Sequence, residues 1–217
     1  AGALDEVNNI IKPGISTSEI DKLCYEYIND HKAFSAPLYY RGYPKSCCTS
    51  SNHVVCHGIP SEKILNDGDI LNVDVTAIKD GWHGDTSRMF VVGECSVKAK
   101  KLIKTTYEAM MEAIKIIKAN IKIGNIGYTI QKIVEAEGFS VVRDFCGHGI
   151  GKKFHESPNV LHYGEKNSGQ ELKAGMIFTV EPMINYGKFE TKTLKDGWTA
   201  VTKDKSLSAQ FEHTVGV

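Results

Sequence analysis

Several absences limit what this chain of 217 residues can do. It has no basic run and no block of like charge, and its 26 basic and 26 acidic residues cancel to a formal net charge of zero. A nucleic-acid partner or a membrane surface usually requires such a concentration of charge. We therefore expect neither partner, and the ligand has to be inferred from local groups of side chains.

Paired cysteines and long apolar runs are absent as well. The six cysteines include no C-x-x-C pair, and Cys47 and Cys48 are adjacent, a spacing that suits neither a disulfide framework nor a zinc ribbon. The chain has no secretory h-region and no apolar run of membrane-spanning length. These absences predict a soluble protein of the reducing cytoplasm.

The composition favours a single domain. A hydrophobic content of 41% is enough for one sizeable core in a chain of this length. The first helical pattern, residues 1–11, has no N-cap before it, and the chain stops at Val217 within a strand-like alternation. We therefore expect one domain over residues 1–217, with both of its ends cut within longer elements.

Two segments 107 residues apart repeat one pattern. Residues 65–74 and 172–181 each contain a glycine turn, at Gly68 and Gly175, followed by a strand-like run that ends in Asp74 or Glu181. Apolar and polar side chains alternate in both runs, so each acid is expected to point away from the buried face of its strand. Duplicated strands with duplicated acids predict a symmetric site between two halves.

A pair of helices is predicted before each acidic strand. Apolar residues at helical spacing indicate helices over residues 1–11, 97–120 and 126–137, and the capping box Ser16-Thr-Ser-Glu19 opens another that carries Ile20 and Ile28. A third echo links two His-Gly segments, Cys56-His57-Gly58-Ile59 and Gly147-His148-Gly149-Ile150.

Three echoes in one order indicate an internal duplication, with halves at about 1–95 and 96–217. The predicted fold is α+β: strands of both halves join in one antiparallel sheet, four helices cover one face, and the site lies on the other. Residues 33–51, rich in Tyr, Pro, Ser and Cys, are predicted to form a long functional loop.

Two more acids are expected near the duplicated pair. The turn residues in Lys79-Asp-Gly-Trp-His-Gly84 predict a hairpin that brings Asp85 beside Asp74. In the second half, alternation from residue 210 to 215 places Glu212 on the face opposite Phe211 and His213. Each half thus offers two acids, and the second half adds His148.

Four carboxylates and one imidazole in a small volume would repel one another and lose solvation, so they require cations. Two divalent ions about 3.5 to 4 Å apart, bridged by shared carboxylates, are the usual arrangement in hydrolases. An oxygen-rich set with one histidine favours Mn(II), Fe(II), Co(II) or Zn. A single strand acid is more often a surface residue, and His148 between two glycines could be a loop histidine; the whole set favours the metal centre.

The motifs that carry these residues resemble those of a known family, the methionine aminopeptidases of the bacterial type I class. The resemblance covers essentially the whole chain, and it rests on Tyr43-Pro44-Lys45-Ser46, Cys56-His57-Gly58-Ile59-Pro60, Asn72-Val73-Asp74-Val75, Gly84-Asp85-Thr86, Gly147-His148-Gly149-Ile150-Gly151, Phe154-His155-Glu156, Phe178-Thr179-Val180-Glu181-Pro182 and Phe211-Glu212-His213-Thr214. It implies the pita-bread fold, a pseudo-twofold sheet backed by two helix pairs.

The same resemblance implies a metal-dependent hydrolase that removes the N-terminal methionine from nascent polypeptides. Asp85 and Glu212 would bridge two metal ions, Asp74 would chelate one of them, and His148 with Glu181 would complete the other. A hydroxide shared by the two ions would attack, and Glu181 would transfer its proton to the leaving amine. We expect a monomer; a contact with the ribosome is the one macromolecular partnership that stays open.

Further residues match the family's substrate and cation positions. His57 would lie near the scissile nitrogen and His155 at the carbonyl oxygen, although either could also serve as a structural hydrogen-bonding group. Positions that match the family's methionine pocket, in addition to these two histidines, are Tyr40, Tyr43, Cys48, Phe154 and Trp198. Backbone carbonyls near Asn52, Val54 and Ser208 match a monovalent cation site.

The chain departs from the family at the outer wall of this pocket. The family usually has a cysteine a few residues before Tyr40, where this sequence reads Ala36-Pro37-Leu38. This departure leaves the identity of the outer wall open. The resemblance does not explain Cys47, which lies beside Cys48.

Two other readings compete with this one. Proline-directed peptidases share the fold, but the Tyr-rich loop and Cys56-His57-Gly58-Ile59 favour the methionine enzymes. A non-catalytic relative that binds peptides would generally lose metal ligands, and this chain has all five.

Overall fold

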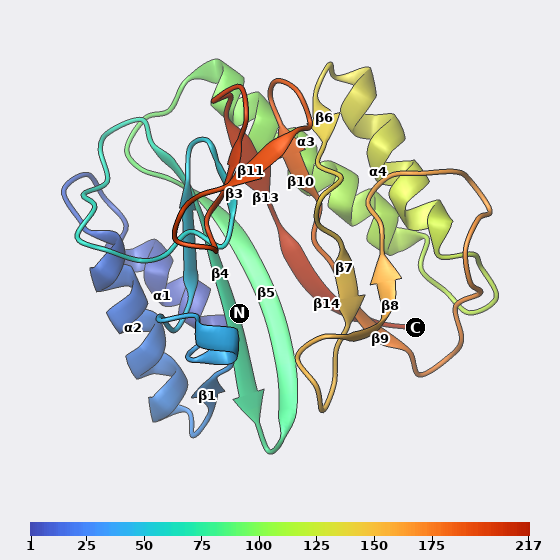
Figure 1. Ribbon diagram of the computed structural model, residues 1–217, viewed down its shortest axis with the longest axis horizontal. Coiled ribbons are helices and arrows are strands. Elements are labelled where there is room, and N and C mark those ends of the chain that lie inside the picture. The colour runs from blue at the N-terminus through green and yellow to red at the C-terminus, as the bar shows by residue number, and fades with distance from the viewer.

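The computed structural model describes residues 1–217, in which four helices and fourteen strands follow one another (Figure 1). The helices are α1 (Gly2–Ile10), α2 (Thr17–Asp30), α3 (Val97–Lys115) and α4 (Gly124–Ala136). The strands before α3 are β1 (Phe34–Ser35), β2 (Cys48–Ser51), β3 (Val54–Cys56), β4 (Ile70–Lys79) and β5 (Trp82–Val91). Those after α4 are β6 (Ser140–Val141), β7 (Gly147–Gly149), β8 (Glu156–Val160), β9 (Ile177–Val180), β10 (Met183–Asn185), β11 (Thr191–Thr193), β12 (Ala200–Thr202), β13 (Ser208–Gln210) and β14 (Glu212–Gly216).

One large antiparallel sheet runs through both halves of the chain. Its strand order is β1-β4-β5-β14-β9-β7-β8, with β2 also paired to β4. The halves meet where β5 pairs with β14, and there the Thr214 hydroxyl donates to Asp85 O at 2.8 Å and accepts from Asp85 N at 3.0 Å. Thr86 Oγ1 donates to Glu212 O at 2.9 Å. The predicted sheet shared by both halves is therefore confirmed.

The four helices lie on one face of this sheet, as predicted (Figure 1). Helices α1 and α2 bury Leu4 and Ile20 against Val73 and Val75 of β4. Helices α3 and α4 form a larger core with Phe178 of β9, together with Leu102, Met110, Ile126, Ile130 and Val180. The opposite face of the sheet is left for polar side chains. None of the four helices has the length and apolar character needed to cross a membrane.

The capping and turn residues predicted from the sequence lie at the start of a helix and in the turns that precede or join strands. Ser16 and Glu19 form the expected capping box at the start of α2. The two predicted glycine turns have nearly equal backbone angles, with φ of +90° at Gly68 and +89° at Gly175. Asp80 and Gly81 have φ of +51° and +78°, which suits a two-residue hairpin turn between β4 and β5. The hairpin prediction is confirmed.

Three expectations need correction. Helix α3 ends at Lys115 rather than at Asn120, which adopts φ of +70° and donates its N–H to Leu172 O. The strand-like run over residues 210–215 is not one strand, because β13 pairs with β10 in a separate sheet while β14 joins the large one; the predicted faces still hold, with Phe211 and Val215 toward the core and Glu212 toward the acids. The segment 33–51 is not a plain loop, since it contains β1, a 3-10 turn over Tyr40–Gly42, and β2.

The structure also contains two small sheets that the sequence patterns do not predict. One has the order β13-β10-β6 and the other β11-β12-β3. Both pair strands of two to three residues, which are too short to show a period in the sequence.

Helix α4 packs very closely on the chain that follows β8. A Cβ atom at Gly127 would lie 2.5 Å from Leu161 O and from Tyr163 O. Both neighbours are backbone atoms and cannot rotate away.

We predict that Gly127→Ala destabilises the protein by about 1 to 3 kcal/mol, because the backbone has to shift. The same exchange inside an unobstructed helix would stabilise it by about 1 kcal/mol, so the sign of the effect is diagnostic. Denaturant unfolding measures it, with Gly216→Ala as the control, since a Cβ there meets no atom within 4 Å. A Gly127→Ala protein at least as stable as wild type would contradict the close packing.

Candidate active site

The five predicted metal-binding residues come from five consecutive strands of the large sheet. In the order β4, β5, β14, β9 and β7, the strands contribute Asp74, Asp85, Glu212, Glu181 and His148, with Glu181 one residue past the end of β9. Register explains why they share a face. Asp85 lies opposite Thr76, while Asp74 and Glu212 both lie opposite Ser87, so the period of two turns these acids to the same side.

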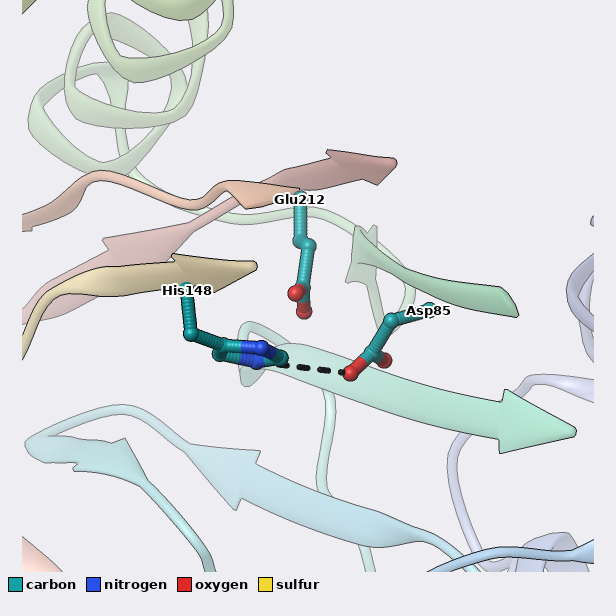
Figure 2. Close-up of side chains that lie close together, drawn as sticks. All are labelled: Asp85, His148 and Glu212. Carbon is teal, nitrogen blue, oxygen red and sulfur yellow. Dashed lines mark ion pairs between the residues drawn. The ribbon is translucent and has the colours of Figure 1, made fainter. Parts of the chain in front are cut away.

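The side chains converge on one point. One ligand atom from each of Asp85, His148 and Glu212 lies within 4.8 Å of the other two, and Figure 2 shows these side chains pointing toward one another. His148 Nε2 is 3.9 Å from Asp85 Oδ2 and 3.7 Å from Glu181 Oε1. Asp74 lies beside Asp85, and Glu181 lies beside Glu212. The structure thus brings together all five residues.

Burial makes the ionised form of these acids unfavourable. Desolvation, with the nearby charge of Glu181, raises the pKa of Asp74 to about 7. Desolvation is also the main cause that raises the pKa of Glu181 to about 8. The pKa values of Asp85 and Glu212 are raised by burial and by the neighbouring acids. Four acids in this state need positive charge to ionise together.

The donor set fits divalent cations. Asp74 Oδ1 and Glu212 Oε1 are buried and have no hydrogen-bond partner, although buried carboxylate oxygens normally have one. Arg41, at the rim, is the one Lys or Arg side chain among the residues that line the adjoining cavity. Burial lowers the pKa of His148, so its imidazole is neutral and can donate a lone pair. Carboxylates with one imidazole suit Mn, Fe(II), Co or Zn.

Threonine hydroxyls orient two of the acids. Thr76 Oγ1 donates to Asp85 Oδ1 at 2.8 Å, and Thr179 Oγ1 donates to Glu181 Oε1 at 2.7 Å. Thr179 Oγ1 also accepts from the backbone N–H of His148 at 3.0 Å. Neither Thr76 nor Thr179 was among the residues predicted for the site. Their signal is the period of two, because Thr76 follows Asp74 by two residues and Thr179 precedes Glu181 by two.

A cavity of about 380 Å³ opens beside the acids. All seven residues predicted to contact substrate line it, namely Tyr40, Tyr43, Cys48, His57, Phe154, His155 and Trp198. Pro37, from the segment expected at the outer wall, lines it too, whereas five further lining residues were not predicted, namely Arg41, Asp144, Phe145, Cys146 and Met183. Their positions depend on how distant loops meet, and no local pattern indicates them. A mostly aromatic and sulfur-containing lining suits a thioether side chain.

Aromatic packing shapes this cavity. The rings of Tyr43 and Trp198 meet edge to face at 5.1 Å between centroids, and the ring of His57 lies 5.5 Å from that of Phe145. Burial lowers the pKa of His57. These contacts fix the direction of side chains that come from loops far apart in the sequence.

His155 lines the cavity together with His148 and the acids. Its ring is 4.2 Å from that of His148, and its Nδ1 is 3.0 Å from the Tyr40 hydroxyl. Desolvation among the surrounding rings, followed by the nearby imidazole of His148, lowers the pKa of His155 to about 4. The ring is therefore neutral at physiological pH.

The wall formed by residues 43–48 is held from behind by α2. Asp21 accepts hydrogen bonds from Ser46 N at 2.8 Å and from Cys47 N at 3.2 Å. The Tyr43 hydroxyl donates to Cys47 O at 3.0 Å and to Gly58 O at 3.1 Å. Cys47 is fully buried in the core beneath α2, which separates its role from that of Cys48 in the cavity.

Two of the three residues predicted for a monovalent cation are adjacent. Ser208 N donates to Asn52 O at 2.8 Å, and Asn52 adopts φ of +55°. Val54 lies two residues further along, opposite Val201 in the pairing of β3 with β12.

Comparison with known proteins gives consistent matches over the full chain. The model of metallopeptidase family M24 matches residues 1–217. The chain is 55% identical over 218 residues to a methionine aminopeptidase of Rickettsia prowazekii (strain Madrid E), covering 100% of this chain and 84% of that protein. It is 56% identical over 219 residues to a methionine aminopeptidase of Escherichia coli (strain K12), covering 100% and 83%. The crystal structure of methionine aminopeptidase from Rickettsia prowazekii superposes with a TM-score of 0.99 at 55% identity, covering 100% of this chain and 88% of that one.

The raised pKa values of the acids lead to a prediction about metal binding. With pKa values of about 7 for Asp74 and about 8 for Glu181, the metal-free protein holds protons on these acids near neutral pH. A divalent cation has to displace those protons, so its affinity should rise as pH rises through this window. Titration calorimetry with Mn²⁺ at pH 7, in two buffers of different ionisation enthalpy, measures the release. Equal heats in the two buffers would contradict the prediction.

Proposed function

The chain belongs to the bacterial methionine aminopeptidases of metallopeptidase family M24, and from this premise we propose that it removes the N-terminal methionine of nascent polypeptides through a dinuclear metal centre. The observation that carries the proposal is the set of five donors from five consecutive strands, which meet beside an aromatic cavity. The fold and the enzyme class follow from the relatives. The five residues of the metal centre are inferred from this geometry, whereas their division between two ions and the roles of His57 and His155 are what the resemblance to the family implies.

The five donors would hold two divalent ions. We assign Asp85 and Glu212 to both ions, Asp74 to one, and His148 with Glu181 to the other; Co, Mn, Fe(II) and Zn all suit the set. When bound, the ions would supply a hydroxide nucleophile at neutral pH and polarise the scissile carbonyl.

Glu181 would act as the proton carrier of the reaction. Its Oε1 is held by the Thr179 hydroxyl at 2.7 Å, which favours one orientation of the carboxylate. In this orientation the Glu181 carboxylate would receive the proton of the attacking water and pass it to the leaving amine.

His155 would bind the scissile carbonyl oxygen. A neutral imidazole that accepts a hydrogen bond from the Tyr40 hydroxyl at Nδ1 carries its proton on Nε2. This Nε2–H would donate to the oxygen as negative charge develops on it. His57, held against Phe145 in the cavity wall, would contact the substrate near the scissile nitrogen.

The substrate methionine would enter the cavity beside the acids. Tyr43, Cys48, Trp198 and Phe154 provide apolar and polarisable contacts for a thioether side chain, and Tyr40 closes the side next to His155. Pro37 lines the cavity in the segment where the family usually has a cysteine. A proline ring would therefore replace a thiol in this part of the wall.

Other features of the proposal concern the whole chain. We infer one catalytic domain built from duplicated halves, about 1–95 and 96–217, and the equal angles at Gly68 and Gly175 support it. Six free cysteines, five of them buried, suit a reducing compartment. We propose that the protein is a cytoplasmic monomer. Asn52, Val54 and Ser208 are proposed to bind a monovalent cation through their carbonyls.

We predict that Asp85→Ala abolishes most of the activity, because it removes a ligand shared by both ions. The release of methionine from Met-Ala-Ser should fall by more than about 100-fold, the upper range for changes to residues that only support a ligand. Amino-acid analysis of the products measures it, with the metal-reconstituted wild type as reference. Equal rates for the two proteins would exclude the dinuclear hydrolase.

A second prediction separates His155 from the metal ligands. His155→Ala should lower kcat by about 100-fold, as expected for the loss of one donor to a developing oxyanion, while metal content stays unchanged. Tyr40→Phe removes the hydrogen bond to Nδ1 and should have a smaller effect. Metal analysis and steady-state kinetics test both variants. Loss of both ions from His155→Ala would make this residue a ligand instead.

A further inference from the structure

A histidine outside the predicted site contacts the backbone of Glu181. His162 lies two residues past the end of β8 and is 1% exposed, and its Nε2 accepts a hydrogen bond from Glu181 N at 3.0 Å. Nothing in the local sequence distinguishes this histidine from a core residue. Its position becomes informative because Glu181 is one of the five donors.

The Glu181 N–H needs this acceptor because the chain leaves the large sheet there. Strand β9 ends at Val180, and after Pro182 the chain enters β10, which pairs with β13 and β6 in a separate sheet. Glu181 thus has no strand neighbour to accept its N–H. A buried N–H without a partner costs roughly 1 to 3 kcal/mol, and the imidazole of His162 prevents that cost.

Hydrogen bonds thus hold both the side chain and the backbone of Glu181. The Thr179 hydroxyl donates to its carboxylate, and His162 accepts from its backbone N–H. Thr179 in turn accepts from the N–H of His148, the other donor assigned to the same ion. If the Glu181 backbone could rotate, its carboxylate would point in a different direction.

The hydrogen bond requires one tautomer of His162. An imidazole that accepts at Nε2 carries its proton on Nδ1 and is neutral. Since the Glu181 N–H can only donate, Nε2 of His162 has to be the acceptor of this pair.

We propose that His162 is a positioning residue for Glu181, acting as the acceptor that replaces the missing strand partner and so directs the Glu181 carboxylate toward the metal centre. This role rests on the proposed function of Glu181. His162 touches neither the reacting atoms nor the cavity.

Two amide variants form a matched pair for the test. In His162→Gln the side-chain oxygen can reach the position of Nε2, whereas in His162→Asn it reaches only as far as Nδ1. The affinity of the metal-free proteins for Mn²⁺, measured by calorimetry, is the first readout, and kcat and KM on Met-Ala-Ser are the second. Thermal unfolding shows that both variants are folded.

The Asn variant should bind Mn²⁺ about 10- to 100-fold more weakly and lose kcat by a similar factor, with little change in KM. The Gln variant should stay close to wild type in both readouts. Equal metal affinity in the two variants, whether both match wild type or both are impaired, would overturn the proposal. So would a long-range ¹H–¹⁵N spectrum of the wild type with the His162 proton on Nε2.

The two readouts separate this proposal from the proposed function. If wild type releases no methionine, the proposed function fails, while the difference in Mn²⁺ affinity between the Gln and Asn variants still decides the role of His162. If wild type is active and that difference is absent, only the role of His162 fails.

Discussion

The structure is organised around the repulsion among four buried carboxyl groups. Asp74, Asp85, Glu181 and Glu212 lie on one face of the sheet, and burial together with their mutual proximity raises the pKa of each. Such a group is unfavourable unless cations bind, so the fold has to hold the acids in place by other means. The central strands, the hydrogen bonds between the Thr214 hydroxyl and the Asp85 backbone, and the hydroxyls of Thr76 and Thr179 supply that rigidity.

The two halves share a plan and differ in detail at the site. Asp74 and Glu181 follow equivalent glycine turns, but only Glu181 stands at a strand end with a threonine on its carboxylate and a histidine on its backbone. The His-Gly segments differ as well: His148 lies in β7 among the acids, whereas His57 adopts φ of +56° and lines the cavity. The proposed duplication would account for the acidic centre, and divergence between the halves would account for the different positions of His148 and His57.

Much of this site could be predicted because its residues obey the period of a strand. Alternation correctly assigned Asp74 and Glu212 to the polar face, and the turn at Asp80 and Gly81 correctly indicated the hairpin. What could not be predicted depends on pairing between distant segments. The change of sheet at Phe211, the acceptor at His162 and the buried place of Cys47 are set by contacts across the fold. The end of α3 at Lys115 shows that apolar spacing alone does not set a helix end.

The central claim is that the five donors bind two metal ions. Crystals of the protein grown with Mn²⁺, measured by anomalous scattering at the manganese edge, test it most directly. The account predicts two peaks about 3.5 to 4 Å apart, both in contact with Asp85 and Glu212, one also with Asp74 and the other with His148 and Glu181. An active protein whose crystals show no peak at these residues, or a single peak bound elsewhere, would contradict it.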